Sequence, residues 1–311
     1  MRKIIFLICF AFLFRALQLY ALCNFFDIAL FTQENHYTNT YKKTKNVNVN
    51  IKNVDLQIEK SKDDNIYIEH NGKIEESTDT LFLTEHIKEN NLLSLKRNEA
   101  IKIFLPDNVN IIFDTYNSNV EIKNATLTNI SDTYSEKTTF TIKNINVTEK
   151  MSLRETNDDI SIDNSTIQNI EIYTNDDIKV TNSTFNNADF SANYGNVDME
   201  NIKSEKFVCY GRAGDTSLNN IKAKTIKIGG RSEIGYPSYA YIKNIEADII
   251  NLEHRAIKEA SILLAGDAYE VYYEKTNKEE EEIIKNKKPN KKLLFVYYKR
   301  HKDVISFKNE I

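Results

Sequence analysis

The chain has 311 residues, of which 41% are hydrophobic and 28% charged, so it is long enough to bury a substantial core. Its net charge of -4, with Lys and Asp/Glu interspersed, supplies no cationic field for nucleic acid, and we expect none to bind. Because only 8 Gly and 3 Pro occur, turns must be formed mainly by Asn and Asp, whose short side chains hydrogen-bond to nearby backbone.

The beginning of the chain has the pattern of an export signal. Basic residues 1–3 precede an apolar run over residues 4–14, which has the length of a signal-peptide core and is short for a membrane span. Residues 16–31 are again mostly apolar, so an uncleaved anchor is the alternative. A further alternative is a lipoprotein in which Cys23 is acylated. We expect residues 1–22 to be a signal peptide or N-terminal anchor, and the protein to be extracytoplasmic: periplasmic, on the cell surface or secreted.

One cysteine lies outside this segment. Cys209 has no partner for an intramolecular disulfide, because Cys9 and Cys23 belong to the export segment. Its position is in register with Ile172, Phe190 and Ile228 of the repeat described below. We therefore expect Cys209 to be a small buried core residue.

Alternation of apolar and polar residues begins after a polar lead-in over residues 23–46. Val47, Val49 and Ile51 open a block with the period of two that is typical of strands with one buried face. A second such block ends at Pro106, which cannot donate to a central strand ladder. We expect these strands to begin and cap a larger stack.

The middle of the chain repeats a phrase of an apolar residue, any residue and then Asn. Successive copies of this Asn are 20, 20, 18, 19, 19 and 24 residues apart, and that period is typical of a solenoid. Asn tolerates left-handed backbone angles, and its amide can bond the next rung at about 4.8 Å spacing. The predicted structural ladder at one corner is Asn124, Asn144, Asn164, Asn182, Asn201, Asn220 and Asn244.

The predicted fold is therefore all-β: a single-domain parallel β-solenoid, or β-helix, over residues 47–266 with about 18–20 residues per rung. The longest spacing indicates an insertion loop between Gly229 and Tyr241. Residues 267–311 are expected to cap the stack with strands around the charged run 275–292, most simply as a hairpin, although residues 278–285 could instead form a short helix.

Three features together resemble the bacterial putative-adhesin β-solenoid family, which includes the head-domain GIN group and the LiaG-like proteins. They are the early alternating block, the phrase Ile101-Lys-Ile-Phe-Leu-Pro106, and rungs with a turn before an apolar-x-apolar pair. The match would cover about Val47 to Phe307, with turn glycines mostly replaced by Asn or Asp. The resemblance implies an exported envelope protein of β-helical fold with no established chemistry, and it carries no catalytic residue to transfer.

Two acidic motifs could carry chemistry. Residues 156–159 read Thr-Asn-Asp-Asp, and the same phrase recurs 18 residues later at 174–177. Stacking on adjacent rungs would bring two carboxylate pairs together, as in a Ca²⁺ site or the paired acids of a glycosidase. Asp is also an ordinary corner residue, and we favour that interpretation. The candidates are Asp158, Asp159, Asp176 and Asp177.

A second column lies just after the second strand of successive rungs: Arg154, Tyr173, Ser191 and Tyr210. Outward tyrosines beside an arginine could stack on sugar rings and hydrogen-bond through their hydroxyls. Tyr is, however, frequent in this chain and is favoured in strands by propensity alone.

These patterns predict a non-catalytic, adhesin-like binding or scaffolding protein of the cell envelope. We expect no catalytic residue, cofactor or metal, and a partner that is an envelope protein or a glycan, with membrane attachment through the N-terminus left open. The alternatives are a polysaccharide-active β-helix lyase or hydrolase, because fold alone does not exclude one, and a purely structural spacer.

Overall fold

The computed structural model describes residues 37–70, 73–77, 79–86, 100–230, 238–254, 257–265, 269–288, 291–297 and 305–308. The predicted signal segment and the Cys23 lipidation lie outside these residues, as does most of the predicted insertion loop. Residues from Thr38 onward form one compact unit, which is the unit described below. Among the described residues, no helix combines the length and the apolar character that crossing a membrane requires.

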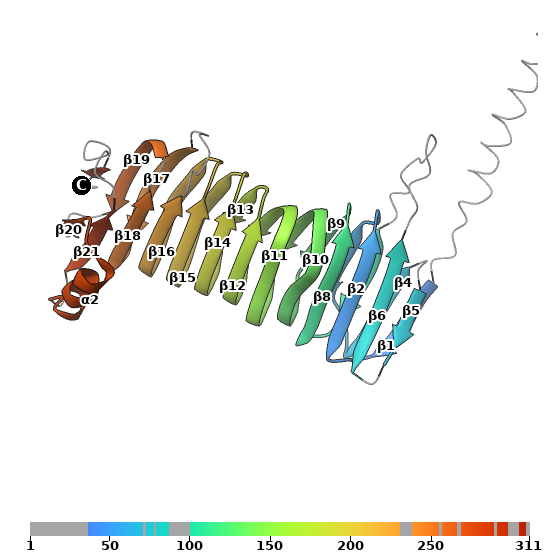
Figure 1. Cartoon of the computed structure of the whole chain (residues 1–311). Coiled ribbons are helices and arrows are strands. Elements are labelled where there is room, and N and C mark those ends of the chain that lie inside the picture. Colours follow the sequence, from blue (N-terminus) through green and yellow to red (C-terminus); the bar gives the residue numbers. More distant parts are fainter. Residues whose placement is uncertain are drawn as a thin grey trace, which may run out of the picture. The chain divides into compact units, whose positions relative to one another are not determined.

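The predicted parallel β-solenoid is confirmed, and the described rungs make about eight turns (Figure 1). Equivalent residues of successive rungs pair in register: Ile142 pairs with Ile162, which pairs with Val180. In the same way Phe190 pairs with both Ile172 and Cys209. Cys209 is buried as predicted, and burial raises the pKa of its thiol to about 12. The inward apolar residues of successive rungs join into one continuous core.

Each rung contributes to two walls, which we call the long-strand wall and the short-strand wall. Strands of the repeat form the middle of both walls: β8 (Val109–Tyr116), β9 (Asn119–Lys123), β10 (Thr126–Lys143), β11 (Asn146–Asp163), β12 (Thr166–Thr174), β13 (Ile178–Thr181), β14 (Thr184–Ala192), β15 (Val197–Gly211) and β16 (Thr216–Gly230). On the long-strand wall, β12 pairs with β11 and β14. On the short-strand wall, β13 pairs with β11 and β15. Long strands such as β10 and β11 run through both walls.

The Asn corner joins the short-strand wall to the long-strand wall. All seven predicted Asn residues have left-handed backbone angles, with φ between 47° and 57°. The residue after each Asn turns inward, as buried Ser165 and Ile202 do. Amide bonds link most of the ladder; for example, Asn164 Nδ2 donates to Asn144 Oδ1 at 2.7 Å. The ladder is exposed rather than inside the corner, because the left-handed turn points its side chains outward.

One link of the ladder differs from the prediction. Asn182 Nδ2 donates to Asp163 Oδ1 at 3.0 Å rather than to Asn164. Asn182 Oδ1 in turn accepts a bond from Asn201 at 3.0 Å. Asp163, the residue before Asn164, accepts hydrogen bonds from both Thr181 and Asn182 of the next rung. Side-chain hydrogen bonds thus connect the corner from Asn124 to Asn220, with Asp163 taking part in one of the links.

The first edge of the stack contains β1 (Tyr37–Lys42), β2 (Asn46–Lys52), β3 (Leu56–Lys60), β4 (Asn65–His70), β5 (Lys73–Glu76), β6 (Thr80–His86) and β7 (Ile101–Leu105). Strand order in space departs from chain order here, because β2 lies between β6 and β8, and β3 lies between β7 and β9. Antiparallel pairs β4–β7 and β5–β6 stand at this edge. Part of the predicted polar lead-in is strand β1.

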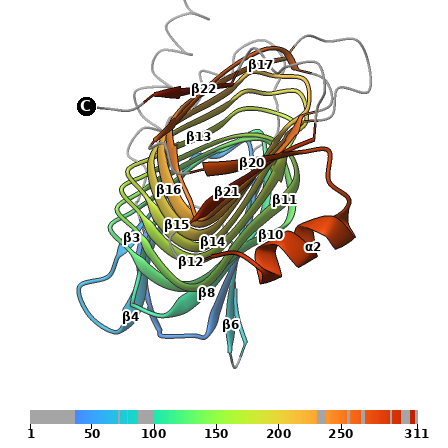
Figure 2. The same ribbon diagram turned by 90° about the vertical axis from the view of Figure 1, so that its left-hand side faces the viewer.

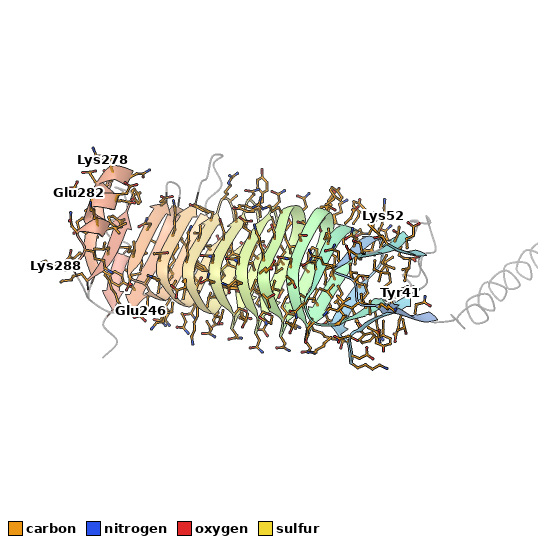
Figure 3. All side chains as sticks on the ribbon, turned by 90° about the horizontal axis from the view of Figure 1, so that it is seen from below. Tyr41, Lys52, Glu246, Lys278, Glu282 and Lys288 are labelled. Atoms are coloured by element: carbon orange, nitrogen blue, oxygen red, sulfur yellow. The ribbon has the colours of Figure 1, made fainter. Side chains whose placement is uncertain are left out.

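The last part comprises β17 (Ser238–Glu246), β18 (Ile249–His254), β19 (Ile257–Ala265), β20 (Tyr269–Tyr273), α2 (Asn277–Lys285), β21 (Lys292–Val296) and β22 (Ile305–Lys308). The predicted hairpin is wrong, because β20 and β21 pair in parallel and continue the long-strand wall beyond β18. The charged run forms the helix that was its alternative, and α2 lies outside the stack (Figure 2). Its exposed residues Lys278 and Glu282 point away from the strands (Figure 3).

Candidate functional site: a tyrosine-lined groove

An outward column crosses the long-strand wall from β12 to β21. Because Ile172, Phe190 and Cys209 face inward, the residue that follows each of them faces outward. The parallel register of the strands then aligns these outward residues from rung to rung. The column continues past β18 to Tyr297, whose backbone N–H donates to Leu252 O at 3.1 Å. Its members in order are Tyr173, Ser191, Tyr210, Gly229, Glu253 and Tyr297.

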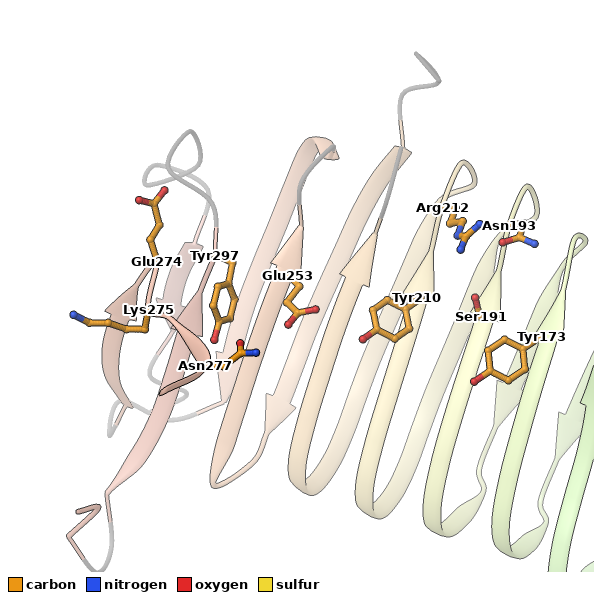
Figure 4. Close-up of a pocket in the computed structure, with 10 residues that line it drawn as sticks. All are labelled: Tyr173, Ser191, Asn193, Tyr210, Arg212, Glu253, Glu274, Lys275, Asn277 and Tyr297. Atoms are coloured by element: carbon orange, nitrogen blue, oxygen red, sulfur yellow. The ribbon is translucent and has the colours of Figure 1, made fainter. Parts of the chain in front are cut away.

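A groove of about 770 Å³ lies along this column (Figure 4). All members of the column except Gly229 are among its lining residues. Asn193 and Arg212 line it from the turns at the far ends of β14 and β15. The predicted column thus coincides with a concave surface of the size that ligand sites have. Arg154 is not among the residues that line it.

Beyond Tyr297, the groove is walled at its end by the segment that leads into α2, through Glu274, Lys275 and Asn277 (Figure 4). A capping box fixes this segment: Glu279 N donates to Thr276 Oγ1 at 3.4 Å, and Thr276 N donates to Glu279 Oε2 at 2.8 Å. Glu274 has a left-handed backbone, with φ of 50°, where the chain leaves β20. The helix start therefore holds the groove wall in a defined position.

Tyr210 lies across a glycine of the next rung. A Cβ atom at Gly229 would overlap Cδ1 and Cε1 of the Tyr210 ring, so the ring occupies the space that a side chain would take. Lys227 Nζ lies 6.0 Å from the centre of this ring. Gly229 is thus required for the position of Tyr210 on the floor of the groove.

Tyr173 is held by groups on both neighbouring rungs. Its hydroxyl donates to Asp189 Oδ2 at 3.1 Å, and Arg154 Cζ lies 5.6 Å from its ring centre. Arg154 is also paired with Glu171. Burial, followed by the charge of Asp189, raises the pKa of the Tyr173 hydroxyl, so it stays a neutral donor. Arg154 acts on the groove by supporting Tyr173.

Charges within the groove are balanced. Beside the groove, Lys227 Nζ pairs at 2.9 Å with Oε1 of the lining residue Glu253. Burial lowers the pKa of Lys227, but hydrogen bonds to Glu253 and Tyr210 outweigh burial and raise it overall. Glu280 of α2 faces the same pair; burial, followed by the charge of Glu253, raises its pKa. Its Oε1 is buried without a hydrogen-bond partner among the described residues, which places α2 against the long-strand wall.

The two acidic motifs do not form one cluster of carboxylates. Asp158 points into the core, where it accepts hydrogen bonds from Ser135 Oγ and from Thr138 N, the latter at 2.7 Å. Burial raises the pKa of Asp158 to about 6. Asp176 is half-buried, and burial also raises its pKa, followed by the nearby charge of Asp159.

The other two acids are exposed corner residues in a backbone-binding column. Asp159 Oδ1 accepts the N–H of Asp177 at 3.3 Å, and Asp177 Oδ1 accepts the N–H of Asn196 at 2.6 Å. Asn196 repeats this arrangement with Asp215 at 2.9 Å. In the described part of the chain, no three His, Cys, Asp or Glu side chains are grouped as a metal site would need. The geometry of these acids is that of turn formation.

Sequence reasoning missed the far half of the groove. Glu253 on β18 and Tyr297 just after β21 are 44 residues apart, and they lie side by side because none of the intervening elements β19, β20 and α2 lies between β18 and β21. A local signal for the wall did exist: Thr276 followed three residues later by Glu279 is a capping-box pattern.

Comparison with known proteins gives one family and two similar structures. The family model described as Toastrack DUF4097 matches residues 44–208, more than half of the chain. A putative adhesin from Bacteroides fragilis NCTC 9343 is 13% identical, with 74% of this chain and 97% of that chain covered and a TM-score of 0.36. A putative cell adhesion protein from Clostridium sporogenes ATCC 15579 is 12% identical, with 74% and 99% covered and a TM-score of 0.20. No curated protein matches this chain.

Proposed function

Because the chain belongs to the Toastrack DUF4097 family, we propose that it is an exported, adhesin-like solenoid. We propose further that it binds a component of the cell envelope and catalyses no reaction. The observation that carries this proposal is the groove along the long-strand wall. Its floor is a column of outward side chains on consecutive paired strands, and its wall is set by a capped helix. Such a rigid, preformed concave surface favours binding, because little order is lost when a ligand enters.

Three of the candidate acids have structural roles that favour binding over hydrolysis. A glycosidase needs two carboxyl groups placed on either side of the bond that is cleaved. Glu253 is instead ion-paired with Lys227, while Asp159 and Asp177 accept backbone N–H groups of the next rung. The proposal therefore assigns no reaction to the groove.

Binding to the envelope is tested by co-sedimentation of the full-length chain with insoluble envelope fragments of its host cells. We expect saturable binding by the wild type and by Tyr241→Ala, whose exposed tyrosine lies on the short-strand wall. Tyr210→Ala should bind at least about tenfold more weakly, because it removes an aromatic ring from the groove floor. Absence of saturable binding by the wild type would contradict the proposal, and release of soluble sugar fragments would favour the enzyme alternative. Equal saturable binding by all three proteins would contradict the role of the groove, because the binding surface would then lie elsewhere, whereas absence of binding would favour a spacer.

Export is tested separately by mass spectrometry of the protein made in a bacterial host. We expect a chain that begins near residue 22 or 23, because the apolar run over residues 4–14 has signal-peptide length. Additional acyl mass on Cys23 would identify the lipoprotein form. An intact Met1 in the soluble cytoplasmic fraction would contradict the proposed location.

A further inference from the structure

We propose that the groove binds a neutral glycan chain, with Tyr210 as a stacking platform seated on Gly229 and Tyr173 as a second aromatic contact two rungs away. This inference rests on the proposed binding function and specifies the chemical class of its ligand. Three properties of the groove support it: its backbone N–H and C=O groups are already paired within the wall, its tyrosine rings are placed along one line, and its charges are balanced.

Backbone pairing favours recognition by side chains. The strands that carry Tyr173, Ser191 and Tyr210 are each paired on both sides by the neighbouring rungs. Their N–H and C=O groups are therefore engaged within the wall. A peptide that binds by adding a strand needs a free edge with unpaired backbone groups, and the middle of this wall does not provide one. A ligand that lies across it must contact rings, hydroxyls and amides.

The tyrosines are placed for stacking along an extended ligand. Two rungs separate Tyr173 from Tyr210, which corresponds to about 9.6 Å at a strand spacing of about 4.8 Å. Because the Tyr210 ring covers Gly229, it lies on the wall instead of standing away from it. A tyrosine presents an apolar ring together with a polar hydroxyl, and this combination matches the mixed C–H and O–H surface of a sugar.

Charge balance selects a neutral chain. The charged lining residues comprise two cations, Arg212 and Lys275, and two anions, Glu253 and Glu274. Beside the lining, the cation Lys227 pairs with Glu253 at 2.9 Å and is matched by the neighbouring anion Glu280 of α2, so cations and anions stay equal in number. Acidic polysaccharides and single-stranded nucleic acids require an excess of positive charge along their path. Ser191, Asn193 and Asn277 add uncharged hydrogen-bonding groups, which suit sugar hydroxyls.

The test is isothermal titration calorimetry of the full-length chain with hexasaccharides of matched length. The neutral probes are β-1,4-linked glucose and β-1,4-linked N-acetylglucosamine, and the acidic probe is α-1,4-linked galacturonate. We expect a neutral hexasaccharide to bind at least about tenfold more tightly than the acidic one. Tyr210→Ala should weaken that binding at least about tenfold, whereas Tyr241→Ala, the control on the short-strand wall, should leave it unchanged. Circular dichroism of each variant checks that the solenoid is folded.

Two outcomes would overturn the inference while leaving the proposed function intact. One is preferential binding of the acidic hexasaccharide. The other is no binding of any hexasaccharide by a protein that still sediments with envelope fragments, which would assign the groove to another ligand. Neutral binding that is equally strong in Tyr210→Ala and Tyr241→Ala would also overturn it, because the platform would then play no part. If Tyr210→Ala fails to fold, Tyr210→Phe and Tyr173→Ala replace it: a folded Tyr173→Ala should lose binding and Tyr210→Phe should retain most of it.

Discussion

Successive rungs carry the same residue at the Asn corner but different residues along the groove. Seven Asn residues share one backbone conformation, with φ between 47° and 57°. The outward column of the long-strand wall instead changes from rung to rung, through tyrosine, serine, glycine and glutamate. Uniform positions maintain the stack, because each rung must repeat the same turn and the same bonds. Varied positions give the stack a local shape, and the groove lies where they vary.

This difference predicts that corner and core substitutions will change stability, while groove substitutions will change binding. An exposed side chain on a paired strand contributes little to stability unless it fills space or satisfies a buried group. A corner residue, by contrast, determines backbone geometry and bonds on two neighbouring rungs. The following predictions are ordered by the size of their expected effect on the free energy of unfolding.

The largest effect is expected for Asp158, a buried carboxyl group among buried polar side chains of neighbouring rungs that include Ser135 and Thr174. Burial raises its pKa from 3.8 to about 6, aided by the charges of Asp132 and Asp176 and opposed by bonds from Ser135 and Thr138. The folded state therefore binds this proton more tightly than the unfolded state does. Its contribution to stability is greatest below about pH 4 and declines as the pH rises through about 6, by about 3 kcal/mol in total.

Asp158→Asn keeps an acceptor for Thr138 N–H and removes the titrating group. Urea titrations of both proteins at pH 4, 5, 6 and 7 measure the free energy of unfolding. As the pH rises, the variant should gain in free energy of unfolding relative to the wild type. Carboxyl groups common to both proteins cancel in this difference. A difference that stays constant from pH 4 to pH 7 would contradict the assignment.

An intermediate effect is expected at the Asn corner. Asn201 donates to Asn182 Oδ1 at 3.0 Å and accepts from Asn220 Nδ2 at 2.7 Å. Asn201→Ala loses both bonds and places a Cβ-bearing side chain without local hydrogen bonds at φ of 57°, so it should cost about 2 kcal/mol. Asn201→Gly keeps the backbone conformation and should cost about 1 kcal/mol.

The control for this pair is Lys179→Ala, on the exposed side of the short-strand wall, which should be close to neutral. Denaturant titration of the three variants measures the order. Equal losses for Ala and Gly at position 201 would show that the backbone angle contributes nothing, and negligible losses for both would remove the energetic role of the ladder.

The smallest effect on stability is expected for Gly229→Ala. The new Cβ would overlap the Tyr210 ring, which is the mobile end of a side chain and can move away, so the cost should stay below about 1 kcal/mol. Glycan affinity should nevertheless fall about as much as in Tyr210→Ala, because the displaced ring no longer covers the groove floor. Thermal unfolding and calorimetric titration together measure both effects. A variant that retains full affinity would show that the glycine seat is dispensable.

Sequence alone was sufficient for the repeating part of the molecule. The period of two determines which residues of a strand face inward, and an Asn at a fixed place in the rung marks each corner. Both are local properties of the sequence. The solenoid, its ladder, the burial of Cys209 and the column through Tyr173, Ser191 and Tyr210 could all be placed in this way. The inward direction of Asp158 follows the same period, because it lies two residues before buried Ile160, but its hydrogen bonds from Ser135 and Thr138 on the neighbouring rung could not be predicted locally.

Tertiary structure decided how non-repeating segments join the stack. At one corner Asp163 takes the place of the Asn partner, and the strand order β6, β2, β8 differs from the order in the chain. The groove depends most on this level, because Glu253, Tyr297 and the segment before α2 meet only after the intervening strands have been accommodated elsewhere. A repeat specifies contacts between neighbouring rungs through residues about 20 apart. Contacts across insertions of variable length have no such period, so only the packed chain determines them.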